Sequence, residues 1–94
     1  MMIHKLKIWS ECFEAVLRDQ KRVEIRKEDR GFKVGHYLLL QEWDPERESY
    51  TGREVVRRIT HIVKGDEGLQ PGYVALSLTD PKWFQSAGDP RDRY

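Results

Sequence analysis

The decapeptide from residue 21 to residue 30 carries the side chains best suited to chemistry. It reads KRVEIRKEDR, with five basic and three acidic residues around two apolar ones. The guanidinium of Arg26 is a planar fork that fits a phosphate or a base edge, and Lys21 supplies a point charge. Glu24 adds an acceptor for amino or ring N–H groups, which a groove for phosphate alone would not need. This set predicts a pocket that reads an unpaired nucleobase.

A short strand is expected to position these groups. Because side chains alternate along a strand, Val23 and Ile25 are predicted to face the core. The opposite face then carries Arg22, Glu24 and Arg26. The same pattern also fits a solvated strand face on which Glu24 pairs with the neighbouring basic side chains. Each exposed ion pair would stabilise the fold by about 0–1 kcal/mol.

The segment before this strand predicts a strand at 4–8 and a helix at about 11–18. Ser10 stands where its hydroxyl can cap the helix by accepting a backbone N–H bond. The apolar positions of the helix follow the i, i+3, i+4 spacing of one face; they are Phe13, Val16 and Leu17. The chain then turns at Asp19 and Gln20 into the charged strand.

The segment after it predicts three further strands at hairpin spacing. The apolar run Tyr37–Leu40 indicates a strand at 36–43, and a long strand is expected at 53–63, with Tyr50 as an exposed turn residue before it. The dipeptide Pro71-Gly72 suits a type II turn. The last strand is expected to turn its apolar residues inward; they are Val74, Leu76 and Leu78.

Several motifs in this chain carry a resemblance to a known family. They are Lys21-x-x-Glu24-Ile25-Arg26, Leu38-Leu39-Leu40-x-x-Trp43-Asp44-Pro45, Phe32-Lys33-Val34-Gly35 and Pro71-Gly72-Tyr73-Val74. From about Lys5 to Leu78 the chain resembles the DUF3850 family, a branch of the ASCH domains within the PUA-like superfamily. The resemblance implies a mainly β (α+β) fold, a small barrel of about five mostly antiparallel strands with one helix after the first strand. We therefore expect one domain at 1–80 and a mobile tail at 81–94.

The resemblance also implies a ligand cleft between the helix, the turn at 19–21 and the end of the first strand. The family pattern there is Gly-x-Lys-x-x-Glu-x-Arg, and this chain has Asp19 in place of the glycine. Glycine in such a turn supplies a positive φ, which aspartate tolerates at some cost. The carboxylate of Asp19 could also pair with Lys21.

We therefore expect an RNA-binding domain, or more broadly a nucleic-acid- or nucleotide-binding domain, that recognises a single-stranded or modified base. The predicted binding residues are Lys21, Glu24, Arg26, Trp9, Arg30 and Lys7. Trp9, Trp43, Tyr50 and Tyr73 are the candidates for stacking on a base.

Two alternative functions stay open. Some ASCH-like proteins are amidohydrolases that act on acetylated cytidine, and this resemblance would make Lys21 the base or nucleophile, with Glu24 as a possible general base to water. Here Glu24 stands at the family's threonine position. The other alternative is a protein-interaction or regulatory module without a nucleic-acid ligand.

Composition limits the remaining possibilities. The chain has 94 residues, 35% of them charged, and a formal net charge of only +1. Affinity for a nucleic acid would therefore require the basic residues to cluster on one part of the surface. Arg53, Arg57 and Arg58 could extend a basic path, although adjacent Arg57 and Arg58 point to opposite faces of a strand.

The single cysteine, Cys12, and the three histidines lack metal-ligand spacing, so neither a metal nor a cofactor is expected. No apolar run would span a membrane, and a cytoplasmic location is expected.

Overall fold

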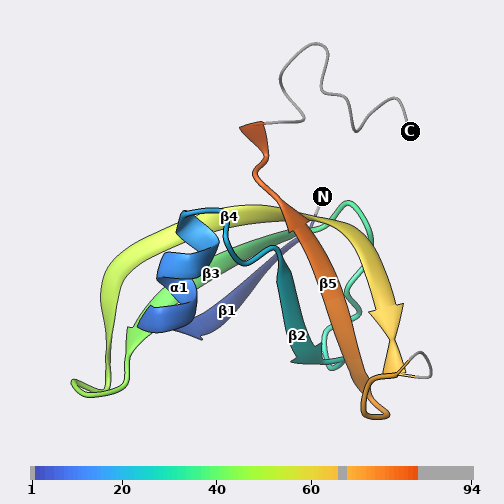
Figure 1. Cartoon of the computed structure of the whole chain (residues 1–94), viewed down its shortest axis with the longest axis horizontal. Coiled ribbons are helices and arrows are strands. Elements are labelled where there is room, and N and C mark those ends of the chain that lie inside the picture. The colour runs from blue at the N-terminus through green and yellow to red at the C-terminus, as the bar shows by residue number, and fades with distance from the viewer. Residues whose placement is uncertain (1, 66–67, 83–94) are drawn as a thin grey trace.

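The computed structural model describes residues 2–65 and 68–82 (Figure 1). Along the chain the elements are β1 (Ile3–Trp9), α1 (Ser10–Leu17), β2 (Val23–Lys27), β3 (Tyr37–Asp44), β4 (Ser49–Lys64) and β5 (Tyr73–Thr79). The tail predicted at 81–94 lies, from residue 83 onward, outside the described residues.

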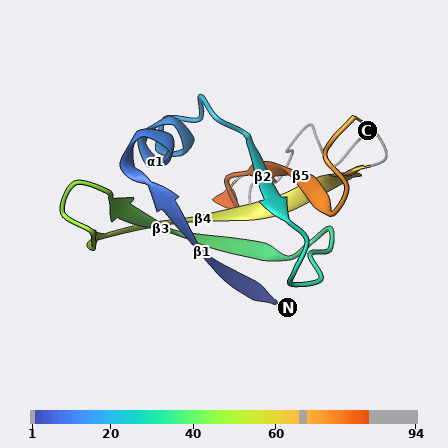
Figure 2. The ribbon, with the colours of Figure 1, turned by 90° about the horizontal axis from the view of Figure 1, so that it is seen from below.

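The strands form one five-stranded mixed sheet in the order β1-β3-β4-β5-β2. β1 runs parallel to β3, and the other three pairings are antiparallel. Figures 1 and 2 show that the sheet curls into a half-barrel, with α1 at one end of it. The prediction of a mainly β fold with one helix after the first strand is confirmed. β1 and β2 are the two edge strands of this sheet.

The core lies on the concave face of the sheet, under α1. Alternate residues of the strands point inward, as the period of two requires. The buried hydrophobic residues are Leu6, Ile8, Phe13, Val16, Phe32, Leu38, Leu40, Ile59, Val74, Leu76 and Leu78. The inward alternation predicted for the last strand is therefore confirmed.

The helix differs from the prediction at both ends. Ser10 does not cap it: Trp9 is the N-cap residue and makes no side-chain cap bond, while Ser10 Oγ donates to the Trp43 carbonyl at 3.3 Å. Ser10 already lies in the first helical turn, where its hydroxyl can reach across to β3. Leu17 is 45% exposed, because it lies about 100° further around the helix axis than Val16 and so turns away from the sheet.

The hairpin of β3 and β4 is longer than predicted. β4 begins at Ser49, so Tyr50 is a strand residue rather than a turn residue. The strand continues through Gly52 (φ 94°) because the register shifts between Gln41 and Trp43, which accommodates extra residues in β4.

The type II turn predicted at Pro71-Gly72 is confirmed. Gly72 has a φ of 86°, and the Tyr73 N–H donates to the Gln70 carbonyl at 3.0 Å.

Candidate functional site

The faces of β2 are the reverse of those predicted. Glu24 points inward and is only 6% exposed, whereas Val23 and Ile25 are turned outward, and Ile25 is 57% exposed. The register explains the reversal, because Glu24 lies opposite Leu76, whose side chain belongs to the core face. Simple hydrophobic alternation failed here, since this edge strand buries a carboxylate that neighbouring cations neutralise.

The carboxylate of Glu24 organises two cationic side chains. Lys21 Nζ donates to Glu24 Oε1 and also to the Val23 carbonyl, the latter at 2.6 Å. Arg26 Nε donates to Glu24 Oε2 at 2.5 Å. Both carboxylate oxygens are therefore engaged. The side chains of Lys21 and Arg26 stay partly exposed, so Glu24 holds two solvent-accessible cations in fixed places.

Two arginines join the edge strands of the half-barrel. Arg26 Nη2 donates to the Lys7 carbonyl at 2.6 Å, and Arg30 Nη1 donates to the Lys5 carbonyl. Both carbonyls belong to β1, while Arg26 belongs to β2 at the opposite edge of the sheet. Side chains thus connect edges that the sheet order leaves unpaired.

Two adjoining grooves open beside this connection. The first has a volume of about 480 Å³, and five of the predicted residues line it: Lys7, Trp9, Lys21, Glu24 and Arg26. The second has a volume of about 390 Å³ and is lined by Arg30, the sixth, and again by Glu24 and Arg26. The structure therefore brings five of the six predicted residues into one groove and places Arg30 in the adjoining one. Apolar groups complete the first groove; they are Ile8, Cys12, Val23 and Ile25.

The turn before β2 has the conformation that the glycine of the family pattern would favour. Asp19 has a φ of 61°, so the prediction of a positive φ is confirmed. Its carboxylate pairs with Arg22 Nη2 at 2.8 Å rather than with Lys21. Lys21 therefore pairs with Glu24 instead of Asp19, and the side chain of Asp19 does not close the groove.

The candidate stacking residues differ in exposure. Trp9 is 61% exposed and Tyr50 is 54% exposed. Trp43 and Tyr73 are half-buried. Lys7 Nζ lies over the Trp43 ring at 4.2 Å from its centroid, which is a cation–π contact. Tyr73 lines the second groove.

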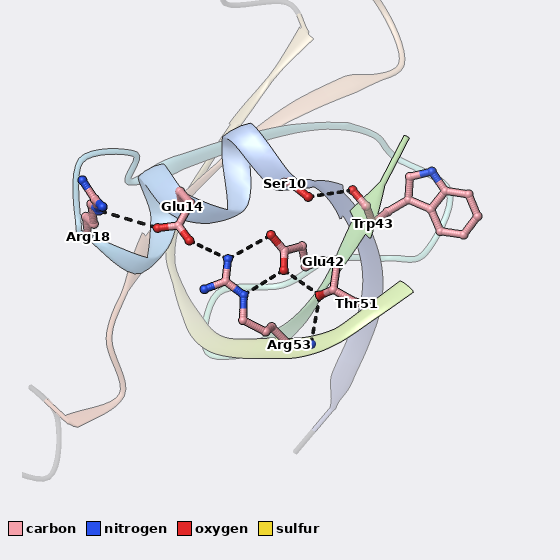
Figure 3. Close-up of polar contacts among 7 residues, drawn as sticks. All are labelled: Ser10, Glu14, Arg18, Glu42, Trp43, Thr51 and Arg53. Carbon is pink, nitrogen blue, oxygen red and sulfur yellow. Dashed lines mark hydrogen bonds and ion pairs between the residues drawn. The ribbon is translucent and has the colours of Figure 1, made fainter. Parts of the chain in front are cut away.

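A second polar cluster joins the β3–β4 hairpin to α1 (Figure 3). The buried Glu42 carboxylate accepts bonds from Thr51 Oγ1 at 2.6 Å and from Arg53 Nε at 2.8 Å. Arg53 also bonds Glu14, which in turn pairs with Arg18 at 3.5 Å, as the i, i+4 spacing predicts. The hydrogen bonds from Arg53 lower the pKa of Glu42 to about 2 against the opposing effect of burial, and Glu42 and Glu14 raise the pKa of Arg53.

Sequence reasoning missed this cluster, although a signal was present. Leu38, Leu40 and Glu42 follow the same inward alternation along β3. A carboxylate in the third inward position needs a buried partner. That requirement pointed to an arginine on the adjacent strand.

The basic path proposed along β4 does not form as predicted. Arg57 is buried; its Nη2 donates to the Val16 carbonyl at 3.1 Å and its Nη1 to the Val56 carbonyl at 2.9 Å. It adds a second bond to this carbonyl of the last helical turn, which also accepts the Asp19 N–H at 3.0 Å, and the C-terminal end of a helix is a favourable place for a cation. Arg53 is tied to two carboxylates. These two arginines therefore stabilise the fold.

The histidines form a separate pair. His4 Nε2 and His36 Nδ1 are 3.0 Å apart, and the His4 ring packs edge-on against Phe32 with centroids at 4.8 Å. Burial lowers the pKa of His4, and the charges of His36 and Arg30 act in the same direction.

Across residues 2–65 and 68–82, no group of three or more His, Cys, Asp or Glu side chains is placed to hold a metal ion. No helix in those ranges is long and apolar enough to cross a membrane.

Comparison with known proteins gives a relative and a family. The chain is 39% identical over 74 residues to the "Uncharacterized 12.9 kDa protein in GpA 3'region" of Escherichia phage P2. That alignment covers 79% of this chain and 65% of the phage protein, so the chain spans just under two thirds of its relative's length. The family described as "Domain of unknown function (DUF3850)" matches residues 3–78. This match covers most of the sheet, the helix and both grooves, and the chain belongs to the DUF3850 family.

Proposed function

We propose that this domain binds single-stranded RNA and takes one unpaired or modified base into the groove between β1 and β2. The observation that carries the proposal is the buried Glu24, which fixes Lys21 and Arg26 at one wall of a groove whose other wall exposes Trp9. Cations bind phosphates and base edges, and an exposed indole stacks on a base face.

The outward-facing apolar side chains of β2 support the same proposal. Val23 and Ile25 give the groove an apolar side between its cations. A splayed-out base has an apolar face and a polar edge, so it uses both kinds of surface. A site for free phosphate would gain little from two exposed aliphatic side chains.

The hydrogen-bonding groups of the groove favour bases with acceptor edges. Both oxygens of Glu24 already accept bonds from Lys21 and Arg26. The groups left for a ligand are the N–H donors of Lys7, Lys21 and Arg26. Uracil O4 or guanine O6 and N7 are acceptors that such donors recognise.

The fold is in keeping with a place in the ASCH branch of the PUA-like superfamily, which we propose as well. A half-barrel of five strands with a helix after the first strand is the architecture that this resemblance implies. The groove also lies where the cleft of ASCH-like domains is expected, beside the turn at Asp19 and the end of β1. This placement supports RNA as the ligand.

The contacts of Lys21 argue for binding rather than amide hydrolysis. A lysine that acts as base or nucleophile needs an unprotonated amine. Lys21 instead donates to a carboxylate and to a backbone carbonyl, which suits the charged ammonium. The oxygens of Glu24 are occupied as well, so activation of water would require these contacts to break.

Fluorescence anisotropy with a labelled single-stranded RNA, and with DNA of the same sequence, tests this proposal. Trp9→Ala and Lys7→Ala are the informative variants because both side chains are exposed. Lys82→Ala is the matched control, since Lys82 lines a separate groove with Leu17 and Pro81. Thermal unfolding should show that all variants stay folded.

We expect RNA binding that weakens as salt rises, with a log–log slope of about −0.7 per phosphate contact. Trp9→Ala should weaken binding about five-fold or more, as loss of a stacked base does. Lys82→Ala should bind like wild type. Lack of binding at about 100 µM protein, the weak end of non-specific affinity, would contradict the proposal.

A further inference from the structure

The register of the sheet places three aromatic side chains in one row. Trp9 of β1 lies opposite Trp43 of β3, and Trp43 lies opposite Tyr50 of β4. The neighbouring pair Ile8 and Glu42 is buried on the concave face, so the aromatic row lies on the outer face. The rings of Trp43 and Tyr50 are in contact, with centroids 5.1 Å apart and planes at 81°.

Lysines border this row on the same face. Lys7 and Lys5 alternate with Trp9 along β1, and Lys7 Nζ lies over the Trp43 ring. Leu39 and Val56 face each other further along the sheet, and Val56 remains exposed. The helix does not cover this surface, because the buried residues of α1 pack into the core of the concave side.

We propose that the outer face of β1, β3 and β4 is a stacking platform for two or three nucleotides that continue from the base in the groove. This inference rests on the proposed function. Trp9 connects the two surfaces, since it lines the groove and begins the row. Two strand spacings separate Trp9 from Tyr50, about 10 Å. Aromatic rows on open sheets stack two or three bases in this way.

Charge favours a nucleic acid over a second copy of the chain as the occupant. Lys5 and Lys7 are placed to meet phosphates while the exposed rings of Trp9 and Tyr50 meet base faces; Trp43, whose ring carries Lys7 Nζ and contacts Tyr50, joins the two. A symmetric pairing of two copies through this face would have to bury the ammonium groups of Lys5 and Lys7, for which the outer face of β4 offers the Glu54 carboxylate, already bonded by Gln41 Nε2 at 2.9 Å. Single-stranded nucleic acid instead offers phosphates to both lysines and base faces to the aromatic rings.

Oligouridines of two, four, eight and twelve nucleotides test the platform in anisotropy titrations. The variant is Tyr50→Ala at the far end of the row, and Tyr50→Phe is the matched control that keeps the ring. We expect Tyr50→Ala to weaken binding of the eight- and twelve-nucleotide RNAs about five-fold or more. Dinucleotide binding should not change, and Tyr50→Phe should match wild type for every length.

Three outcomes would overturn this inference. If Tyr50→Ala binds long RNA like wild type while Trp9→Ala does not, the groove stands and the platform is wrong. If wild type binds none of these RNAs, the proposed function fails and the platform with it. If sedimentation without RNA shows a dimer that Tyr50→Ala abolishes, the row belongs to a contact between copies.

Discussion

At the scale of single residues, the candidate site depends on a carboxylate that is buried between two cations. An ionised carboxylate is costly to bury alone, and the bonds from Lys21 and Arg26 offset that cost. In return, Glu24 fixes where both cations stand. We therefore regard Glu24 as a positioning residue for the ligand groups, and this role can be tested apart from RNA binding.

Glu24→Gln should destabilise the fold. The amide keeps the shape of the carboxylate but cannot neutralise Lys21 and Arg26, and one of its ends is a donor that faces donors. We expect the free energy of unfolding, from urea denaturation, to fall by about 1–3 kcal/mol. Glu46→Gln, at an exposed position of the β3–β4 hairpin, should change it by less than about 0.5 kcal/mol. Equal stability of the two variants would contradict the role given to Glu24.

The donors of the groove also determine which base edge it prefers. Uracil presents an acceptor at O4 where cytosine presents an amino donor at N4, and the two rings are of equal size. Because the groove offers donors, a uridine hexamer should bind more tightly than a cytidine hexamer, by about three-fold or more. Isothermal titration calorimetry measures the difference. Tighter binding of the cytidine hexamer would show that an acceptor such as Glu24 turns toward the ligand.

At the scale of elements, the turn from α1 to β2 delivers Lys21 to the groove. Asp19 takes a positive φ there, and the N–H groups of Gln20 and Lys21 both donate to the Ala15 carbonyl, at 2.8 and 2.9 Å. The arginine contacts to β1 then hold β2 across the mouth of the half-barrel. The geometry of the groove therefore follows from the turn and from the connected edges.

Substitutions at Asp19 test this turn. Glycine and alanine both remove the pair with Arg22, so their difference reports the backbone alone. We expect Asp19→Gly to be more stable than Asp19→Ala by about 1 kcal/mol in urea unfolding, because a Cβ is disfavoured at a φ of 61°. At Gln20, where φ is not positive, the order should reverse, with alanine the more stable. The same order at both positions would show that the turn has another conformation.

The Glu42–Arg53 cluster makes the join between α1 and the hairpin sensitive to acid. The pKa of Glu42 is lowered from an ordinary value of 4.5 to about 2, so its contribution to stability is complete above about pH 4.5. That contribution is lost as pH falls through about 2. Glu42→Gln should be less stable at pH 7 by about 1–3 kcal/mol.

Urea unfolding from pH 7 to pH 2 measures this effect. The stability difference between wild type and Glu42→Gln should shrink as pH falls below about 4.5. Glu46→Gln serves again as the exposed control, and its curve should run parallel to that of wild type. A constant difference for Glu42→Gln across this range would mean that the ionised carboxylate does not stabilise the join.

At the scale of the whole molecule, most of the fold could be predicted from the sequence. Hydrophobic alternation located the strands, and the Pro-Gly turn and the glycine pattern at Asp19 gave correct backbone conformations. The faces of β2 could not be predicted, because alternation assumes that apolar residues point inward. In this edge strand an ion-paired carboxylate takes the inward place, and that exchange depends on contacts with distant Lys7 and Leu76.

The sequence predicted in part which residues lie together in the candidate site. Five of its residues lie in one groove and Arg30 in the next, as a cleft beside the turn required. The role of Arg57 could not be inferred, because its partner Val16 belongs to the helix far away in sequence, and the same holds for the bond of Arg53 to Glu14. The aromatic row depends on the strand register, which only the assembled sheet defines.

An NMR titration shows directly whether RNA binds in the groove between β1 and β2. Amide and indole N–H signals of ¹⁵N-labelled protein would be followed while a single-stranded, uridine-rich RNA is added. We predict that the Trp9 indole signal and the amides of Val23 to Arg26 shift with RNA concentration, and that the amide of Lys82 does not. Shifts confined to the surface around Lys82, or no shifts at about 100 µM RNA, would contradict the assignment of an RNA site to the groove between β1 and β2.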